Sequence, residues 1–153
     1  MFIKFRKMIL SDINNVINLI NRNLEENLVP LIFLNDLFDT SGRFHYVCLH
    51  NNKVIGNISC TIQDTREHDT VLQCHVLCVD FPYRTNGIGT RLMEIVKEEA
   101  TSLNIRSISL YVRSSNLQAK EFYIKQGFEI IKEVSYYENG ALALLMKYTN
   151  LNI

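Results

Sequence analysis

The sequence predicts a mixed α/β fold, in which a central sheet of about seven strands carries helices on both faces. Two observations favour this class. Strand-like and helix-like segments follow one another along the chain in the order β-α-α-β-β-β-α-β-α-β-β, and residues 71–79 form the nearly continuous apolar run of a central strand. With 153 residues, 47% of them hydrophobic and 21% charged, the chain suits one globular domain over residues 1–153.

The first half of the chain contains two predicted helices and three predicted strands. Hydrophobic spacing places strands over residues 2–8, 44–49 and 54–62 and helices over residues 12–26 and 31–38. Ser11 and Asp12 offer side-chain oxygens that would cap the first helix. The pair Asn51-Asn52 marks the turn between the second and third strands.

The second half adds four strands and two helices. The strands are expected over residues 71–79, 105–112, 128–134 and 141–148, and the helices over residues 89–103 and 115–126. Ser115 followed by Gln118 has the spacing of a capping box, so Ser115 is expected to begin the last helix. Gly127 would end that helix, and Asn139-Gly140 predicts a hairpin.

Charge and cysteine content exclude several classes of protein. Sixteen Lys and Arg balance sixteen Asp and Glu, so no overall field would attract a nucleic acid. No apolar stretch approaches the ~18 residues of a membrane helix, and the first residues alternate instead of forming a signal-peptide core. We therefore expect a cytoplasmic protein with no membrane partner. No zinc-ligand spacing is present, so we expect no metal and four reduced, mostly buried thiols at Cys48, Cys60, Cys74 and Cys78.

The segment Arg84-Thr85-Asn86-Gly87-Ile88-Gly89-Thr90 is the most informative part of the sequence. It joins a buried strand to a helix, where several backbone N–H groups lack helical partners and the helix dipole is positive. Gly87 and Gly89 have no Cβ, so a phosphate can approach the backbone, and Arg84 and Arg91 would add charge. The segment is neither a Walker loop nor a GxGxxG motif. A tight strand-to-helix connection without a ligand is the alternative interpretation.

Two motifs together resemble a known family. The pattern Arg84-x-x-Gly87-x-Gly89 after a buried strand resembles the pyrophosphate loop of the GCN5-related N-acetyltransferases, the GNAT family. The later segment, with Asn116, Ala119, Tyr123 and Gly127-Phe128 in order, resembles the second conserved region of that family. The motifs cover roughly residues 71–134, and the order of elements is similar over the whole chain.

The resemblance implies an acetyl-CoA donor, with coenzyme A as co-substrate. Its pantetheine arm would run along the end of the fourth strand, where strands four and five splay apart. Backbone contacts would fall at the end of that strand and the pyrophosphate on the loop amides. The cofactor-binding residues so implied are Leu77, Cys78, Val79, Arg84, Thr85, Asn86, Gly87, Ile88, Gly89, Thr90, Asn116, Ala119 and Tyr123.

The same resemblance suggests two catalytic residues for direct transfer to an amine. Tyr123 matches a family position that often acts as general acid, so it would donate a proton to the coenzyme A thiolate. His75 is the candidate general base, because an imidazole titrates near neutral pH and lies on one strand face with Gln73, Leu77 and Val79. The alternatives are an aromatic residue packed under the cofactor and a buried, hydrogen-bonded histidine.

The acceptor amine is the least determined feature. The segment from Tyr136 to Gly140 resembles protein N-terminal and ribosomal-protein acetyltransferases, although those enzymes often carry Tyr or Glu at the position of Gln73 and His at that of Tyr111. The candidate substrate-binding residues are Glu25, Gln73, Tyr111, Tyr136 and Tyr137. A small-molecule amine acetyltransferase, such as one for glucosamine 6-phosphate, is the alternative, with Arg43, Arg66 and Arg113 as phosphate partners.

Three further possibilities concern the functional class of the protein and its oligomeric state. A non-catalytic acyl-CoA-binding module would keep the glycine loop and lack the proton-transfer groups. A nucleotide-binding α/β domain would use the same loop for a different ligand. Exposed edge strands near the C-terminus would permit a homodimer.

Overall fold

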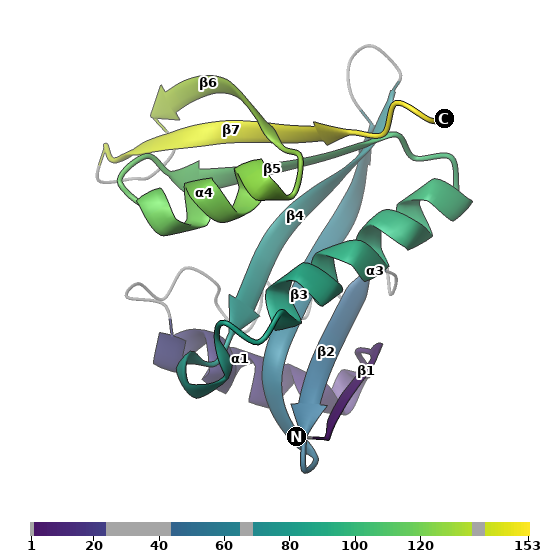
Figure 1. The fold of residues 1–153 in the computed structure, drawn as a ribbon, viewed down its shortest axis with the longest axis vertical. Coiled ribbons are helices and arrows are strands. Elements are labelled where there is room, and N and C mark those ends of the chain that lie inside the picture. The colour runs from purple at the N-terminus through teal and green to yellow at the C-terminus, as the bar shows by residue number, and fades with distance from the viewer. Residues whose placement is uncertain (1, 24–43, 65–68, 136–139) are drawn as a thin grey trace. The chain divides into compact units, whose positions relative to one another are not determined.

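The structure is a computed structural model that describes residues 2–23, 44–64, 69–135 and 140–153. Its seven strands form a mixed sheet in the order β1-β2-β3-β4-β5-β7-β6, which confirms the predicted fold class (Figure 1). The strands are β1 (Ile3–Lys7), β2 (His45–His50), β3 (Lys53–Asp64), β4 (Thr70–Val79), β5 (Ser107–Arg113), β6 (Glu129–Ser135) and β7 (Leu142–Thr149).

The helices include two short 3₁₀ turns. They are η1 (Leu10–Asp12), α1 (Ile13–Asn23), η2 (Phe81–Tyr83), α3 (Ile88–Ser102) and α4 (Leu117–Lys125). The helix predicted over residues 31–38 lies outside the described residues. In the ranges that are described, no helix is both long and apolar enough to cross a membrane.

The pairing between β4 and β5 is parallel and short. It joins Val71 to Ser107, Leu72 to Ile108 and Gln73 to Ser109. By contrast, β5 pairs with β7 through all seven of its residues. The short parallel pairing confirms the predicted splay between strands four and five.

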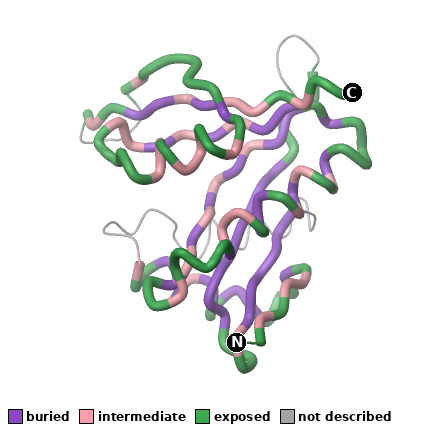
Figure 2. The backbone as a smooth tube through the Cα atoms, in the orientation of Figure 1, coloured by how far each residue is buried: buried purple, intermediate pink, exposed green. Residues whose placement is uncertain are grey.

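The chain divides into two compact units, the first made of Met1–Thr61 and His75–Glu99 and the second of Ile62–Cys74 and Ala100–Ile153. In the first unit, helices cover both sheet faces. Apolar residues of α1 pack with Val47, Leu49, Val76 and Cys78, while Cys48, which points to the other face, lies near the first turn of α3. Figure 2 shows β2, and β3 from Val54 to Thr61, buried between these layers.

Asp12 directly precedes α1, and its side chain binds residues that come before it in the sequence. Its carboxylate accepts two hydrogen bonds from Arg6, at 2.6 and 2.9 Å, and one from the backbone N–H of Ile9 at 2.8 Å. The predicted cap oxygen therefore joins β1 to the turn η1. The Asn51-Asn52 turn is confirmed, since both residues have positive φ, as a tight hairpin turn requires.

In the second unit, the start of α4 corrects one prediction. The helix begins after Asn116, whose side-chain oxygen accepts the Ala119 N–H at 3.1 Å, so Ser115 is not its cap. Asn and Ser cap equally well, and the backbone turn at Arg113 places Asn116 at the required position. The predicted end is confirmed, since Gly127 follows the helix with φ +93°.

The edge strand β6 is exposed along nearly all its length, including Ile130 and Ile131. An irregularity between Ile130 and Lys132 interrupts its pairing with β7, a feature that protects sheet edges from further pairing. The homodimer stays a prediction.

The four cysteines are buried thiols that form no disulfide bond, as expected. Burial raises the pKa of the Cys48 and Cys78 thiols to about 11, so both stay protonated at neutral pH.

Candidate functional site

The loop between β4 and α3 begins with a fixed turn. The Asp80 N–H donates to the Ile55 carbonyl at 2.8 Å, which ties the end of β4 to β3. The next two backbone bonds, from Tyr83 to Asp80 and from Arg84 to Phe81, close the 3₁₀ turn η2. After it, residues 84–87 are exposed and Ile88 is buried, so the loop faces solvent while the helix that follows is anchored in the core.

The loop backbone has the form of an anion cradle. Thr85 and Gly87 have positive φ values of +68° and +76°, whereas Asn86 between them does not. A backbone that alternates between left-handed and right-handed residues turns successive N–H groups toward one side. Gly87 accepts the first backbone bond of α3, from Arg91, yet has no side chain to cap the helix. The first N–H groups of α3 thus lack an intrahelical acceptor. Apart from Gly87 itself and its two neighbours in sequence, no heavy atom of the described residues lies within 4 Å of a Cβ placed on Gly87.

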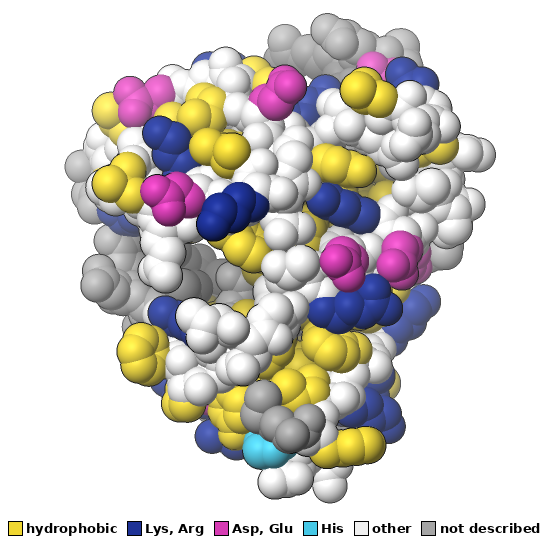
Figure 3. Space-filling view, in the orientation of Figure 1, with side chains coloured by type: hydrophobic (Ala, Val, Ile, Leu, Met, Phe, Trp, Pro, Cys, Tyr) yellow, Lys and Arg dark blue, Asp and Glu magenta, His cyan; other side chains and the backbone are white. Residues whose placement is uncertain are grey.

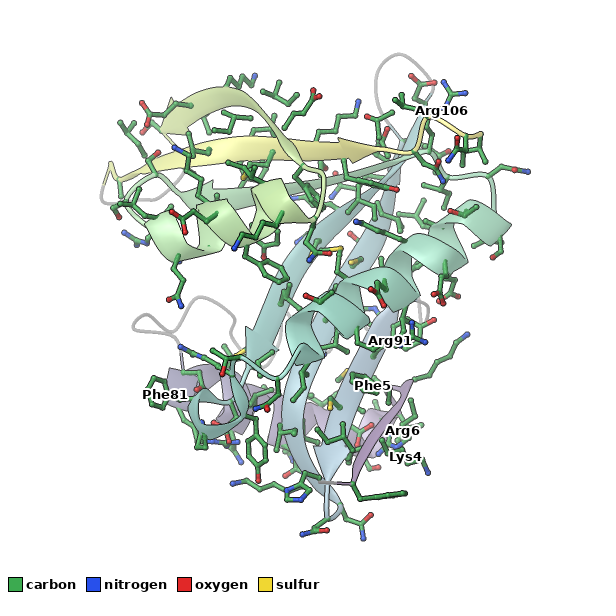
Figure 4. The ribbon with its side chains drawn as sticks, in the orientation of Figure 1. Lys4, Phe5, Arg6, Phe81, Arg91 and Arg106 are labelled. Atoms are coloured by element: carbon green, nitrogen blue, oxygen red, sulfur yellow. The ribbon has the colours of Figure 1, made fainter. Side chains whose placement is uncertain are left out.

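The two arginines of the loop are already engaged. Arg84 donates through Nε to the Val79 carbonyl at 3.0 Å, and its guanidinium lies 5.4 Å from the centre of the Phe81 ring. Arg91 pairs with Glu94 and Glu98 on the surface of α3. Figure 3 shows basic and acidic side chains adjacent over this helix, and in Figure 4 Arg91 and Phe81 lie well apart. Arg91 is therefore balanced by acidic partners, whereas Arg84, bonded to a neutral carbonyl, keeps its positive charge beside the backbone N–H groups of the loop.

An ion cluster centred on the buried Asp80 carboxylate lies at the start of the loop. Asp80, 4% exposed, accepts two hydrogen bonds from Arg22 and one from Asn23, with Lys53 3.9 Å away. Burial opposes ionisation of this carboxyl, but the hydrogen bonds from Arg22 and Asn23 and the charges of Arg22 and Lys53 outweigh it and lower its pKa. Sequence reasoning missed this cluster. Its only local signal was one acidic residue directly after an apolar strand.

Gly56 sets how closely α3 approaches the sheet. A Cβ at this position would lie 3.2 Å from the Cys48 Cβ and the Ile88 Cγ2, and 3.4 Å from the Leu92 Cδ1. The first turn of α3 lies this close to β3 because residue 56 lacks a side chain, and a Cβ there would require Cys48 or Ile88 to shift by a few tenths of an ångström.

We expect Gly56→Ala to lower the free energy of unfolding by about 1–2 kcal/mol, since the added methyl overpacks a closed contact. Urea titration measures the change. In an Ile88→Ala background the same methyl fills vacated space, so its cost is expected to fall. Equal costs in both backgrounds would contradict the close approach of helix and strand.

His75 lies on the half-buried face of β4. The Thr61 Oγ1 is 2.7 Å from its Nε2, and because a hydroxyl both donates and accepts, either neutral tautomer is satisfied. Burial lowers the pKa of His75, so the ring is neutral at physiological pH and able to take up a proton. Leu77 and Val79 follow on the same face, whereas the Cys78 side chain lies in the core near the Leu19 carbonyl. Only the backbone of Cys78 remains for a ligand.

The second unit holds the other candidate residues. Tyr123 stacks edge-to-face with Phe122 and Phe128, at centroid distances of 5.3 and 5.5 Å. These contacts hold the Tyr123 ring against Phe122 of the same helix and against Phe128, which follows the helix. Gln73 pairs with Ser109, two residues before Tyr111, so the side chains of Gln73 and Tyr111 lie on one sheet face.

The first unit thus gathers the loop of residues 84–90 with His75, Leu77 and Val79, and the second holds Gln73, Tyr111, Asn116, Ala119 and Tyr123. Glu25, Tyr136 and Tyr137 lie outside the described residues, as do Arg43 and Arg66. Among the described residues, no group of three or more His, Cys, Asp or Glu side chains is arranged to hold a metal ion.

Comparisons with known proteins identify the family and the fold of the chain. The family model described as "Acetyltransferase (GNAT) family" matches residues 12–128. The "Probable N-acetyltransferase san" of Drosophila melanogaster is 34% identical over 98 residues, which are 63% of this chain and 53% of that protein. The chain thus spans about half the length of that relative.

Two further similarities cover nearly the whole chain. The "N-alpha-acetyltransferase" of Sulfurisphaera tokodaii is 29% identical over 152 residues, 94% of this chain and 90% of that protein. A solved chain of the NatC complex, bound to Gag peptide and CoA, has a TM-score of 0.89 at 22% identity, covering 97% of this chain and 99% of that one. The fold is therefore that of the GNAT acetyltransferases.

Proposed function

Because the chain belongs to the acetyltransferase (GNAT) family, we propose that it is an acetyl-CoA-dependent N-acetyltransferase whose acceptor is the α-amino group of a protein N-terminus. The observation that carries the proposal is the exposed, glycine-bearing loop before α3, in which Thr85 and Gly87 have positive φ at a helix start. The N-alpha-acetyltransferase of S. tokodaii and the peptide-bound NatC complex support the choice of acceptor.

The loop fits a diphosphate. Positive φ at Thr85 and Gly87 turns N–H donors to one side, and Gly87 leaves open space where a side chain would stand. Residues 84–90 would hold the diphosphate, and the backbone of Leu77 and Val79 would lie along the arm. When bound, acetyl-CoA supplies the thioester carbonyl as electrophile.

Two residues would move the protons of the transfer. The amine nitrogen forms a bond to the carbonyl carbon, and the carbon–sulfur bond breaks with its electron pair on sulfur. The neutral His75 ring takes a proton from the attacking amine, directly or through water. The Tyr123 hydroxyl donates a proton to the departing thiolate.

A thiol-release screen tests the proposed function. Short peptides with free N-termini are compared with glucosamine 6-phosphate and a polyamine, and mass spectrometry locates the acetyl group. We expect release of thiol with peptides and acetylation of the α-amine. Release only with the sugar phosphate would favour the small-molecule enzyme instead. Binding of coenzyme A without thiol release from any acceptor would favour the non-catalytic module.

The pH dependence of the rate tests His75. Because burial lowers the pKa of His75, kcat should rise with pH through a midpoint below ~6.5 and then level off. His75→Gln is expected to remove this limb and lower kcat about tenfold at neutral pH, with water relaying the remaining protons. An unchanged pH profile in His75→Gln would exclude His75 as the base.

A further inference from the structure

Asn23, the last residue of α1, has every hydrogen-bonding position of its carboxamide engaged. Its Nδ2 donates to the Leu19 carbonyl at 2.8 Å and to the Asp80 Oδ1 at 2.9 Å. Its Oδ1 accepts the Phe81 N–H at 2.9 Å and receives a longer contact of 3.5 Å from the Arg84 Nη2. Two donors and two acceptor positions are the full capacity of an amide side chain.

The partners fix which way this amide points. A carbonyl and a carboxylate only accept, so the Nδ2 must face Leu19 and Asp80. A backbone N–H and a guanidinium only donate, so the Oδ1 must face Phe81 and Arg84. Asn23 therefore links Asp80 to the turn η2. Its amide nitrogen donates to the Asp80 carboxylate, and its oxygen accepts from Phe81 and Arg84 at the two ends of the turn.

A continuous set of hydrogen bonds leads from this amide to the cradle. Phe81 and Arg84 lie at the two ends of the turn, and the Arg84 side chain also donates a hydrogen bond to the Val79 carbonyl. Asn86 then donates through Nδ2 to the carbonyls of Tyr83 and Arg84. These bonds surround Thr85, a β-branched residue at φ +68°, a backbone conformation that persists only where neighbours hold it.

We propose that Asn23 is a positioning residue for the coenzyme A loop, an inference that rests on the proposed function. By holding Phe81 and Arg84, Asn23 sets the start of the loop whose N–H groups receive the diphosphate. A role limited to finishing α1, through the bond to Leu19, would affect the stability of the protein and leave its affinity for coenzyme A unchanged.

The test uses Asn23→Asp, which has the same shape and replaces the donating Nδ2 by an oxygen facing the Asp80 carboxylate. Asn23→Ala is the second variant, because a negative charge at a helix C-terminus is itself unfavourable. Asn21→Ala, an exposed residue of the same helix, is the matched control. Calorimetry with coenzyme A and steady-state kinetics are measured below the melting temperature of every variant, as shown by circular dichroism.

Loss of these hydrogen bonds is expected to weaken coenzyme A binding about tenfold in both Asn23 variants. The KM for acetyl-CoA should rise in parallel, while the KM for the acceptor, kcat and the Asn21→Ala control stay near wild type. The double variant Asn23→Asp/Asp80→Asn exchanges the two side chains, so that an amide at position 80 donates to a carboxylate at position 23. It is expected to recover most of the affinity for coenzyme A that is lost in Asn23→Asp.

The outcomes separate the two claims. Asn23 variants that bind coenzyme A as tightly as the unaltered protein would overturn the positioning role and leave the proposed function standing. An unaltered protein that gives no heat with coenzyme A would overturn the proposed function and this inference with it.

Discussion

An Asp80→Ala variant is expected to lose about 3 kcal/mol of unfolding free energy, because it removes the buried carboxylate on which Arg22 and Asn23 converge. Asp80 is 4% exposed and accepts hydrogen bonds from Arg22 and Asn23. Without it, the Asn23 amide has an unsatisfied donor and Arg22 loses its bidentate partner. The Arg22 side chain is 37% exposed and can turn to water, which keeps the loss at the low end for buried pairs.

Urea titration of Asp80→Ala beside Glu94→Ala measures this difference. Glu94 also pairs with an arginine, Arg91, but both side chains are about half exposed. Exposed pairs of this kind contribute little, so Glu94→Ala is expected to change stability by less than ~0.5 kcal/mol. Equal effects of the two substitutions would mean that the burial of Asp80 does not strengthen its interactions with Arg22 and Asn23.

The contribution of Asp80 also depends on pH. Its pKa is lowered in the folded protein, so the ionised carboxylate stabilises the fold above the unfolded value of ~3.9. That stability is lost as the pH falls through the lower folded pKa. The difference in stability between the unaltered protein and Asp80→Ala should therefore be full at pH 7 and smaller at pH 3. Asp12, whose pKa is also lowered, is present in both proteins and cancels from the comparison.

Local patterns in the sequence are enough to predict the strands, whereas the anion site at residues 84–90 stays a prediction. A nearly continuous apolar run predicts β4, and Gly87 and Gly89 between a strand and a helix indicate an anion site. The cap of α4 was placed one residue early, at Ser115 instead of Asn116. Both residue types cap helices, and only the backbone turn at Arg113 distinguishes them.

Contacts between distant segments were beyond such patterns. Asn23 and Asp80 are 57 residues apart, and neither belongs to a motif. The need for glycine at position 56 comes from Ile88 and Leu92 of a later helix, so the β3 sequence alone shows only a glycine in a strand. Periodicity reports which face of an element is buried, whereas these contacts depend on which element covers that face.

The largest effect on turnover is expected from Tyr123→Phe, in which kcat should fall about 100-fold as proton donation to the thiolate is lost. The substitution removes the hydroxyl alone. The ring keeps its edge-to-face contacts with Phe122 and Phe128, so the KM for acetyl-CoA should stay within about twofold of wild type.

Tyr148→Phe is the matched control, because Tyr148 belongs to the same aromatic cluster through Phe128, at 5.8 Å, and has no proposed part in the reaction. We expect it to keep wild-type kcat. If Tyr123→Phe behaves like this control, the ring of Tyr123 serves packing alone and water must protonate the thiolate. If kcat falls only in Tyr123→Phe while coenzyme A binding persists, the hydroxyl acts in the transition state and not in holding the donor.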